Sequence, residues 1–284
     1  MRLFTKILSY LKAMRLIICL CASLMALEGY WLSVHRLEVP SLAHILAAVA
    51  AGSGLAFANV LNDILDVEAD RINHPRRPLP SGKITRSEAG WLAALLCGVS
   101  LLSGFLAGWR IFLLVVLVLA FSIIYNLWAR KIPIAGNFIV AASGALTLTI
   151  GYLIGLEGEI PAFPLLATLL FILAREFLET VSDDRGDRLV GRRSISTLWG
   201  KARVLQICLA LIVLSAISLV MPALYLDPLS RALYLLTFTL ISVLPGVIFV
   251  IAIWRDQSTA NIHQVTYRTR LIFFSSLISL LWLV

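Results

Sequence analysis

Charged side chains are scarce in this chain of 284 residues, because only 14% of them are Asp, Glu, Lys or Arg while 60% are hydrophobic. Soluble domains carry about 25% charged residues. The composition therefore excludes two soluble domains and predicts a single membrane-integral domain over residues 1–284. The basic start leads directly into an apolar run without a small-residue cleavage site, so we expect no removed signal peptide.

Cysteine is also rare, with four residues in the chain: Cys19, Cys21, Cys97 and Cys208. All four lie in apolar runs, and none belongs to a Cys-x-x-Cys pair or has a His at ligand spacing. This usage excludes a disulfide framework and a zinc site, and it predicts reduced residues in the protein core.

Long apolar runs make up most of the sequence, and about 20 such residues suffice to cross a bilayer as a helix. They predict nine spans, near residues 16–34, 41–62, 88–108, 111–129, 133–156, 161–181, 203–223, 231–253 and 268–284. The expected fold class is an all-α polytopic membrane protein with about nine transmembrane helices around a central cavity. Residues 1–15 alternate basic and apolar side chains and are expected to lie at the membrane surface.

Most of the 24 basic residues fall on one side of these spans, the side of the N-terminus. Only Arg36, Arg110 and Arg231 fall on the other side, while Arg175 lies within a span. The positive-inside rule then predicts a multi-pass protein of the cell (plasma or inner) membrane, with a cytoplasmic N-terminus and cytoplasmic polar loops. Topology and contacts with anionic lipids account for the net charge of +8, so no nucleic acid partner is expected.

The second span ends in the acidic stretch Asn62-Asp-Ile-Leu-Asp66-Val-Glu-Ala-Asp70. On a continuous helix Asn62, Asp66 and Asp70 fall at i, i+4 and i+8, and therefore on one face. Asp63 belongs to the same stripe, whereas Glu68 points away. Oxygen donors without a nearby His or Cys suit a hard ion such as Mg²⁺. The simpler alternative is that these carboxylates only pair with neighbouring arginines.

A second acidic motif follows the sixth span. Asp183 and Asp187 lie 117 positions after Asp66 and Asp70, and Glu179 and Thr180 then correspond to Asn62 and Asp63. Both motifs end spans that run toward the cytoplasm, so the two stripes are expected to face each other and to hold divalent ions beside a diphosphate. The spacing also predicts an internal pseudo-repeat near residues 41–156 and 161–284.

The loop after the first motif is rich in arginine, and three prolines, Pro75, Pro78 and Pro80, make it stiff. A stiff basic loop beside an acidic stripe is expected to act as a lid over an anion. His74 has no second histidine near it in the sequence and is interpreted as an ordinary loop residue.

The stretch from Asn62 to Pro75, with Arg77-Pro-Leu-Pro-Ser-Gly82, closely resembles the first motif of the UbiA superfamily of membrane prenyltransferases. Tyr125, Arg130-Lys131 and Gly136-Asn137 are similar to the family's connection between spans 4 and 5. Arg175-Glu176, leading to Asp183-Asp-Arg-Gly-Asp-Arg188, is similar to its second motif. The resemblance covers roughly residues 15–203 and is strongest to the archaeal-type, digeranylgeranylglyceryl phosphate synthase branch.

The resemblance implies transfer of a prenyl group from a polyprenyl diphosphate to a lipid or aromatic acceptor among the membrane lipids, with Mg²⁺ as cofactor. By position, it implies that the Mg²⁺–diphosphate residues are Asn62, Asp66, Asp70, Asp183 and Asp187. Weaker candidates for phosphate contacts are Lys83, Arg130 and Lys131. The ring face of Tyr125 is expected to stabilise an allylic cation.

Two motifs depart from the family pattern. In the second acidic motif, Thr180 stands where the branch usually has an earlier Asp and Glu179 where it has a Lys, and in span 1 Arg15-Leu-Ile-Ile18 stands where the family often has Arg-Pro-x-Asn. The acceptor stays open between a glycerol phosphate ether lipid, an aromatic acid or quinol precursor, and a chlorophyllide-type ring. The rival class is a non-catalytic carrier or flippase of polyprenyl phosphate lipids, which would also use cations and an apolar groove.

Overall fold

The computed structural model describes residues 2–35, 37–128, 132–155, 162–189, 191, 193–258, 261–266, 268–269, 279 and 282. These residues form helices and connecting segments, and no strand occurs among them. The helices in the first half are α1 (Arg2–Met14), α2 (Leu16–Val34), α3 (Leu42–Leu65), α4 (Val67–Asn73), α5 (Arg86–Ala107), α6 (Trp109–Leu127) and α7 (Ala135–Gly155). Those in the second half are α8 (Ala162–Ser182), α9 (Asp184–Leu189), α10 (Ile195–Trp199), α11 (Lys201–Val220), α12 (Pro228–Phe238) and α13 (Leu244–Arg255). A 3₁₀ turn, Met221–Tyr225, follows α11, and a π-helical turn, Thr239–Val243, joins α12 to α13.

Seven segments in the described part of the chain are long and apolar enough to cross a membrane. They are Leu16–Val34, Leu42–Leu65, Arg86–Ala107, Trp109–Leu127, Ala135–Ile154, Lys201–Tyr225 and Pro228–Arg255. Helix α8 is as long as these, at 21 residues, but carries three charges, Arg175, Glu176 and Glu179. The ninth expected span, residues 268–284, lies almost wholly outside the described residues. The chain is thus a multi-pass membrane protein, and the count of nine spans stays a prediction.

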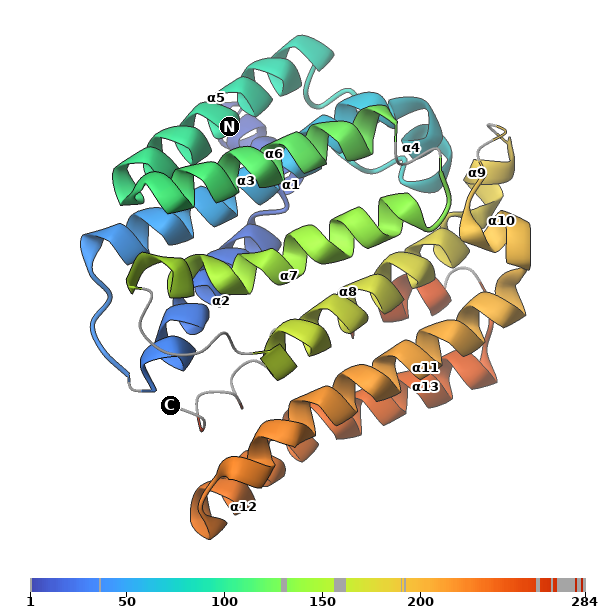
Figure 1. The fold of residues 1–284 in the computed structure, drawn as a ribbon. Coiled ribbons are helices and arrows are strands. Elements are labelled where there is room, and N and C mark those ends of the chain that lie inside the picture. The colour runs from blue at the N-terminus through green and yellow to red at the C-terminus, as the bar shows by residue number, and fades with distance from the viewer. Residues whose placement is uncertain are drawn as a thin grey trace.

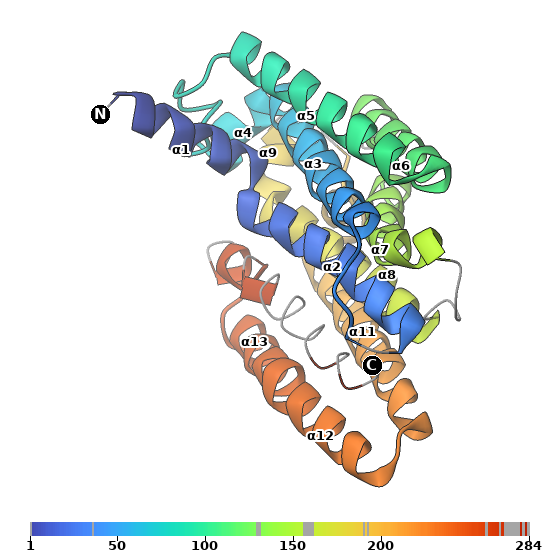
Figure 2. The same cartoon turned by 90° about the vertical axis from the view of Figure 1, so that its left-hand side faces the viewer.

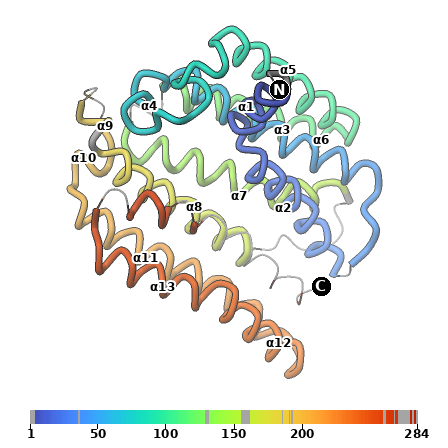
Figure 3. The backbone as a smooth tube through the Cα atoms, turned by 180° about the vertical axis from the view of Figure 1, so that it is seen from behind, coloured from blue at the N-terminus to red at the C-terminus, as the bar shows by residue number. Residues whose placement is uncertain are grey.

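The long helices run side by side, and the short helices α4, α9 and α10 gather at one end of the bundle (Figure 1). Helix α1 projects beside that end, and α12 and α13 form the outer edge next to α11 (Figure 2). The view from behind also places α4 and α9 together at one end (Figure 3), and the two helices are in contact. The polar ends of α3 and α8 therefore meet on one side of the molecule.

Two glycines let α2 and α7 approach closely. A Cβ atom at Gly29 would overlap the carbonyl oxygen of Leu148, and one at Gly151 would overlap that of Ala26. Small residues at such crossings are typical of helices packed in membranes, where backbones gain van der Waals contact. This crossing fixes α2 against α7 beside the cavity described below.

Helix α1 begins the chain with exposed apolar side chains at Phe4, Ile7 and Leu8. Its Lys6 pairs with Glu88 of α5 at 2.7 Å. Between α1 and α2, Arg15 adopts a left-handed backbone conformation (φ 55°, ψ 51°), which few residues other than glycine adopt. The turn directs the Arg15 side chain toward α3, where it bonds Asn59.

Candidate active site

The first acidic motif spans a break between two helices rather than one continuous helix. Helix α3 ends at Leu65, Asp66 has a non-helical conformation (φ −100°, ψ 11°), and α4 begins at Val67. The expectation of one unbroken helix was therefore wrong at Asp66. The i, i+4 pattern nevertheless persists, because Asp66 N donates to Asn62 O and Asp70 N to Asp66 O, each at 2.8 Å.

The second acidic motif has the same local structure. Helix α8 ends at Ser182 and α9 begins at Asp184, so that Asp183 occupies the break as Asp66 does. Asp183 N donates to Glu179 O at 2.9 Å, and Asp187 N donates to Asp183 O at 3.0 Å. In both motifs a long apolar helix ends at a break that carries one carboxylate, and a second carboxylate follows one turn later on a short helix.

The two motifs line one polar cavity of about 110 Å³. Among the residues predicted from the sequence, it brings together Asn62, Asp66, Asp70, Asp183, Asp187 and Tyr125. The remaining lining is mostly polar and comes from the turn before α2, from α4, α7 and α8, and from the loops: Arg15, Asn73, Arg77, Asn137, Glu176, Glu179, Thr180, Arg193 and Ser194 are examples. Asp63 is not part of this lining, although the sequence placed it in the same stripe.

Direct contacts join the motifs across the cavity. His74 Nε2 lies 3.2 Å from Asp183 Oδ1, and Asn73 Nδ2 donates to the Asp183 carbonyl oxygen at 3.4 Å. The ring of His74 also lies 5.3 Å, centroid to centroid, from that of His263. His74 does lie in the loop after α4, as expected, but the fold brings two partners to it, Asp183 and His263, from distant parts of the sequence.

Arginines from two directions pair with the carboxylates of the first motif. Arg77, in the loop after α4, donates from Nη1 to both carboxylate oxygens of Asp70, at 2.7 and 2.6 Å. Arg15 donates to Asp63 Oδ1 at 3.0 Å, and Arg77 Nη1 lies 3.5 Å from the same atom. Asp63 is buried, so its charge is compensated by two guanidinium groups rather than by solvent.

Burial raises the pKa of the Asp70 carboxyl above its ordinary value, while the charge and hydrogen bonds of Arg77 act in the opposite direction. Burial also lowers the pKa of Arg77, but the facing carboxylates of Asp70 and Asp63 outweigh it and leave that pKa raised. The two side chains therefore stabilise each other's charged forms.

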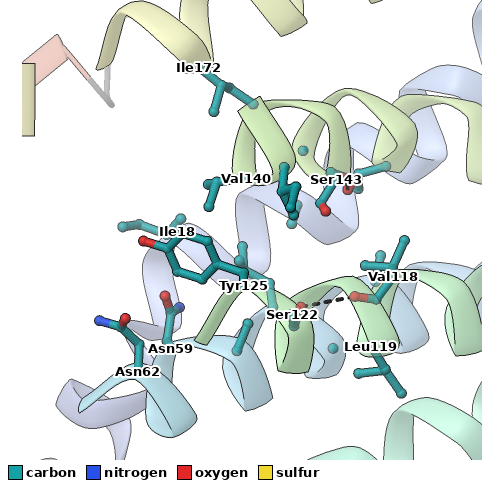
Figure 4. Close-up of a pocket in the computed structure, with 18 of the residues that line it drawn as sticks. Ile18, Asn59, Asn62, Val118, Leu119, Ser122, Tyr125, Val140, Ser143 and Ile172 are labelled. Atoms are coloured by element: carbon teal, nitrogen blue, oxygen red, sulfur yellow. Dashed lines mark hydrogen bonds between the residues drawn. The ribbon is translucent and has the colours of Figure 1, made fainter. Parts of the chain in front are cut away.

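A second cavity, of about 240 Å³, extends from the polar one into the helix bundle. Its lining is largely apolar, and it shares five residues with the polar cavity: Arg15, Asn62, Tyr125, Glu176 and Glu179. Figure 4 shows the ring of Tyr125 near Asn59 and Asn62, with Val118 and Leu119 lying further along α6. The two cavities thus form a polar head and an apolar tail that meet at Tyr125 and Asn62.

Arg175 lies within α8 and lines the apolar cavity. It donates to Glu176 at 2.5 Å and to Glu179 at 2.6 Å. Charges in a span normally face the protein interior or a wet cavity, and here all three charged residues line a cavity. These ion pairs hold Arg175, Glu176 and Glu179 together where the apolar cavity meets the polar cavity.

The structure does not bring every expected phosphate contact to the site. Lys83 is exposed and lines neither cavity. Its own carbonyl oxygen accepts a hydrogen bond from Lys6. Arg130 and Lys131 lie outside the described residues. The basic residues that do line the polar cavity are Arg15, Arg77 and Arg193.

Sequence reasoning did not assign these three arginines to the site. Arg77 gave a signal, because it belongs to the stiff basic loop that was expected to cover an anion. Periodicity gave no signal for Arg15, since its position depends on the left-handed turn before α2; its only signal was its place in the family's span 1 pattern. Arg193 follows α9 and meets the first motif only in three dimensions.

The donors of the polar cavity suit a hard divalent ion. Carboxylate and amide oxygens surround it, and Mg²⁺ in proteins is usually held by one or two carboxylates together with water and substrate phosphates. Within the described residues, no three His, Cys, Asp or Glu side chains cluster closely enough to hold a metal ion by themselves. The arrangement therefore fits an ion that binds together with a phosphate-bearing ligand.

Comparison with known proteins agrees with this geometry. Residues 13–277 match the UbiA prenyltransferase family. Digeranylgeranylglyceryl phosphate synthase of Metallosphaera sedula is 35% identical over 205 residues, which cover 69% of this chain and 72% of that protein. The enzyme of the same name from Methanocaldococcus jannaschii is 33% identical over 215 residues, covering 75% and 74%.

Solved structures share the fold. One of digeranylgeranylglyceryl phosphate synthase has 27% identity and a TM-score of 0.67, with 97% of each chain covered. A UbiA homologue from Archaeoglobus fulgidus, bound to GPP and Mg²⁺, has 17% identity and a TM-score of 0.69, with 95% of this chain and 99% of that chain covered.

The described helices form a membrane bundle in which a polar cavity adjoins an apolar one, and this suits a ligand with a charged head and an apolar tail. The chain belongs to the UbiA prenyltransferase family and is a membrane-embedded prenyltransferase.

Proposed function

We propose that this protein transfers a geranylgeranyl group from its diphosphate to the free hydroxyl of a glycerol phosphate ether lipid, with Mg²⁺ as cofactor. The curated relatives named digeranylgeranylglyceryl phosphate synthase support this choice of acceptor, since their name describes two geranylgeranyl ethers on one glyceryl phosphate. The Archaeoglobus fulgidus structures with GPP or DMAPP and Mg²⁺ support a prenyl diphosphate donor and the metal.

One observation of this chain carries the proposal: the polar cavity and the apolar cavity meet at Asn62 and Tyr125. A prenyl diphosphate has the same two parts, a highly charged head and an apolar chain. With the head among the aspartates and the chain in the apolar cavity, the bond between them lies beside Tyr125. No observation of comparable weight favours the non-catalytic carrier.

Each group then has a physical role. Asn62, Asp66, Asp70, Asp183 and Asp187 are the proposed ligands of the metal–diphosphate head. When bound, Mg²⁺ neutralises the diphosphate and makes it a better leaving group. Arg15 and Arg193, which line the polar cavity, add positive charge toward the departing oxygen. The ring face of Tyr125 stabilises positive charge that develops on the allylic carbon, and the apolar lining keeps water away from it.

The polar cavity lies at the end of the bundle where α4, α9 and the basic loops lie. By the positive-inside rule this end is cytoplasmic. We therefore propose that the protein lies in the cell membrane with its N-terminus and its site toward the cytoplasm, where Mg²⁺ and the donor are available.

The proposal is tested with purified protein in detergent and radiolabelled geranylgeranyl diphosphate. The acceptors are a glycerol phosphate carrying one geranylgeranyl ether, 4-hydroxybenzoate and a chlorophyllide, each assayed over a Mg²⁺ titration. We expect a Mg²⁺-dependent diether product with the first acceptor, together with release of pyrophosphate.

Product formation with only the aromatic or the chlorophyllide acceptor would show that the acceptor is not the ether lipid. It would not contradict prenyl transfer itself. Transfer to the ether lipid at full rate in EDTA would contradict the role of the metal. The same preparation assayed with geranyl diphosphate reports whether donor length matters.

A further inference from the structure

Arg77 is unusual among the cations at the polar cavity because it already binds a proposed metal ligand. Its Nη1 atom donates to both oxygens of Asp70, at 2.7 and 2.6 Å. The Asp70 carboxylate is buried, with 6% of the side chain exposed, and Arg77 is its nearest cation. Charge-assisted hydrogen bonds of this kind are stronger than neutral ones.

A second carboxylate lies within reach of the same guanidinium. Asp63 Oδ1 is 3.5 Å from Arg77 Nη1, only slightly further than the Asp70 oxygens. Asp63 does not line either cavity. It is held in place by Arg15, which donates to it at 3.0 Å and also bonds Asn59. Asp63 is therefore a fixed anion next to Arg77 and outside the proposed metal position.

A divalent cation and a guanidinium on one carboxylate repel each other. Two like charges about 4 Å apart interact strongly where water is largely excluded, and the divalent charge doubles the effect. An ion that approaches Asp70 must therefore weaken or displace the contact with Arg77. Moving Arg77 fully onto Asp63 requires a shift of less than about one ångström at Nη1, and the guanidinium keeps a carboxylate partner throughout.

We propose that Arg77 competes with the divalent cation for Asp70, and that Asp63 is the second carboxylate that receives Arg77 when the cation binds. The inference rests on the proposed metal–diphosphate function of this site. In this proposal Asp63, the second residue of the first motif, does not bind the metal directly but positions Arg77. Arg77 then lowers the affinity of the site for the metal, whereas a residue that helps to bind the metal would raise it.

The test measures metal binding without turnover. Purified full-length protein in detergent is titrated with Mn²⁺ in the presence of inorganic pyrophosphate, and free Mn²⁺ is followed by electron paramagnetic resonance. An identical titration without protein gives the Mn²⁺ held by pyrophosphate in solution, and the difference is the protein-bound Mn²⁺. We expect Arg77→Gln to bind Mn²⁺ about tenfold more tightly than the wild type, because the competing charge-assisted hydrogen bonds are gone.

Two variants control for charge. Arg77→Lys keeps the positive charge near Asp70, so its affinity should stay within about threefold of the wild type. Arg71→Gln removes the same charge from α4, but Arg71 is exposed and pairs with Glu68 at 2.9 Å. Solvent and salt screen that site, so its effect should be less than about twofold.

Equal Mn²⁺ affinity of Arg77→Gln and the wild type would overturn the inference and leave the proposed function intact. Weaker binding by Arg77→Gln would also overturn it, because Arg77 would then help to hold the metal–pyrophosphate head. If neither protein binds Mn²⁺ with pyrophosphate, the metal–diphosphate function fails, and the inference fails with it. A melting curve for each variant checks that Arg77→Gln is folded, and Arg77→Lys gives a second comparison if it is not.

Discussion

His74 Nε2 lies 3.2 Å from Asp183 Oδ1, so the loop after the first motif directly contacts the residue at the break of the second. The preceding residue, Asn73, donates a hydrogen bond from its side chain to the Asp183 carbonyl oxygen at 3.4 Å. Gly186 of α9 lies against the Asn73 side chain, which a Cβ atom at that position would overlap. The distance between the motifs is therefore set by a contact between α4 and α9 as well as by packing of the long helices.

Substituting Gly186 should disturb this contact. In Gly186→Ala the new methyl group forces the Asn73 amide to turn away, and its hydrogen bond to Asp183 is lost. A hydrogen bond of this type contributes about 1 kcal/mol. Alanine is favoured over glycine in a helix by a similar amount, so we expect a melting temperature within about 2 °C of the wild type, but a rate of prenyl transfer about tenfold lower because the carboxylates lose their relative position. Steady-state kinetics and melting curves measure both effects.

Gly98→Ala is the matched control, since Gly98 lies within α5 and a Cβ there would meet no other atom within 4 Å. Alanine is favoured over glycine in a helix interior by about 1 kcal/mol, so this variant should be as stable as the wild type or more so. Equal activity of the Gly186 and Gly98 variants would show that the α4–α9 contact does not position the motifs.

The carboxylates at the two helix breaks should be individually essential. Asp66→Asn and Asp183→Asn each remove one negative charge from the polar cavity, while the amide fills the same space. We expect prenyl transfer to fall at least about a hundredfold with the protein still folded. Without Mg²⁺, the Asp66→Asn protein should melt at the same or a slightly higher temperature, because repulsion between carboxylates is reduced.

Glu68→Gln is the control for these variants. Glu68 is mostly exposed, pairs only with Arg71 among the described residues, and lines neither cavity. Its activity should remain within about twofold of the wild type. Near-wild-type transfer by Asp66→Asn without added divalent metal would refute the metal–diphosphate assignment.

The long apolar helices among the described residues were predictable within a few residues, whereas the short helices α4, α9 and α10 were not predicted. A span expected at 16–34 corresponds to Leu16–Val34, and one expected at 161–181 to Ala162–Ser182. Such agreement has a simple cause, because an apolar run must be helical to satisfy its backbone hydrogen bonds in a membrane. The convergence of Asp66 and Asp183 followed from the same reasoning, since both end spans running in one direction.

The partners of these carboxylates were not predictable in the same way. Arg77 reaches Asp70 because the proline-containing loop folds into consecutive turns, with Arg77 N bonded to His74 O and Lys83 N to Pro78 O. The same turns leave Lys83 exposed and away from the site. The periodicity of apolar residues predicts helices, but it does not determine the path of a loop. It therefore could not show that Arg77, and not Lys83, lies at the site.

The ring of Tyr125 should matter more than its hydroxyl. Tyr125 lines both cavities, and a cation over an aromatic face gains about 2 kcal/mol or more when water is excluded. We expect Tyr125→Phe to keep transfer within about threefold, and Tyr125→Leu to lower kcat more than about tenfold with little change in KM for the donor. Activity of Tyr125→Leu equal to that of Tyr125→Phe would exclude the aromatic role.

The apolar cavity should limit the length of the prenyl chain. Ala51 and Asn62 both lie on α3 and both line this cavity, about 16 Å apart along the helix axis. A large side chain at Ala51 would therefore fill the far part of the cavity and leave the head region unchanged. We expect Ala51→Phe to lower kcat/KM for geranylgeranyl diphosphate more than about tenfold, while activity with geranyl diphosphate is retained.

Ala94→Phe provides the comparison, because Ala94 is exposed on α5 and lines neither cavity. It adds the same side chain to a membrane-facing surface, where apolar bulk is tolerated, so both donors should react as in the wild type. The ratio of kcat/KM values for the two donors is the quantity to compare, since a general loss of folded protein lowers both equally and leaves the ratio unchanged. If that ratio is the same in Ala51→Phe and the wild type, the prenyl chain does not extend along α3 past Ala51, and another route for it through the bundle must be sought.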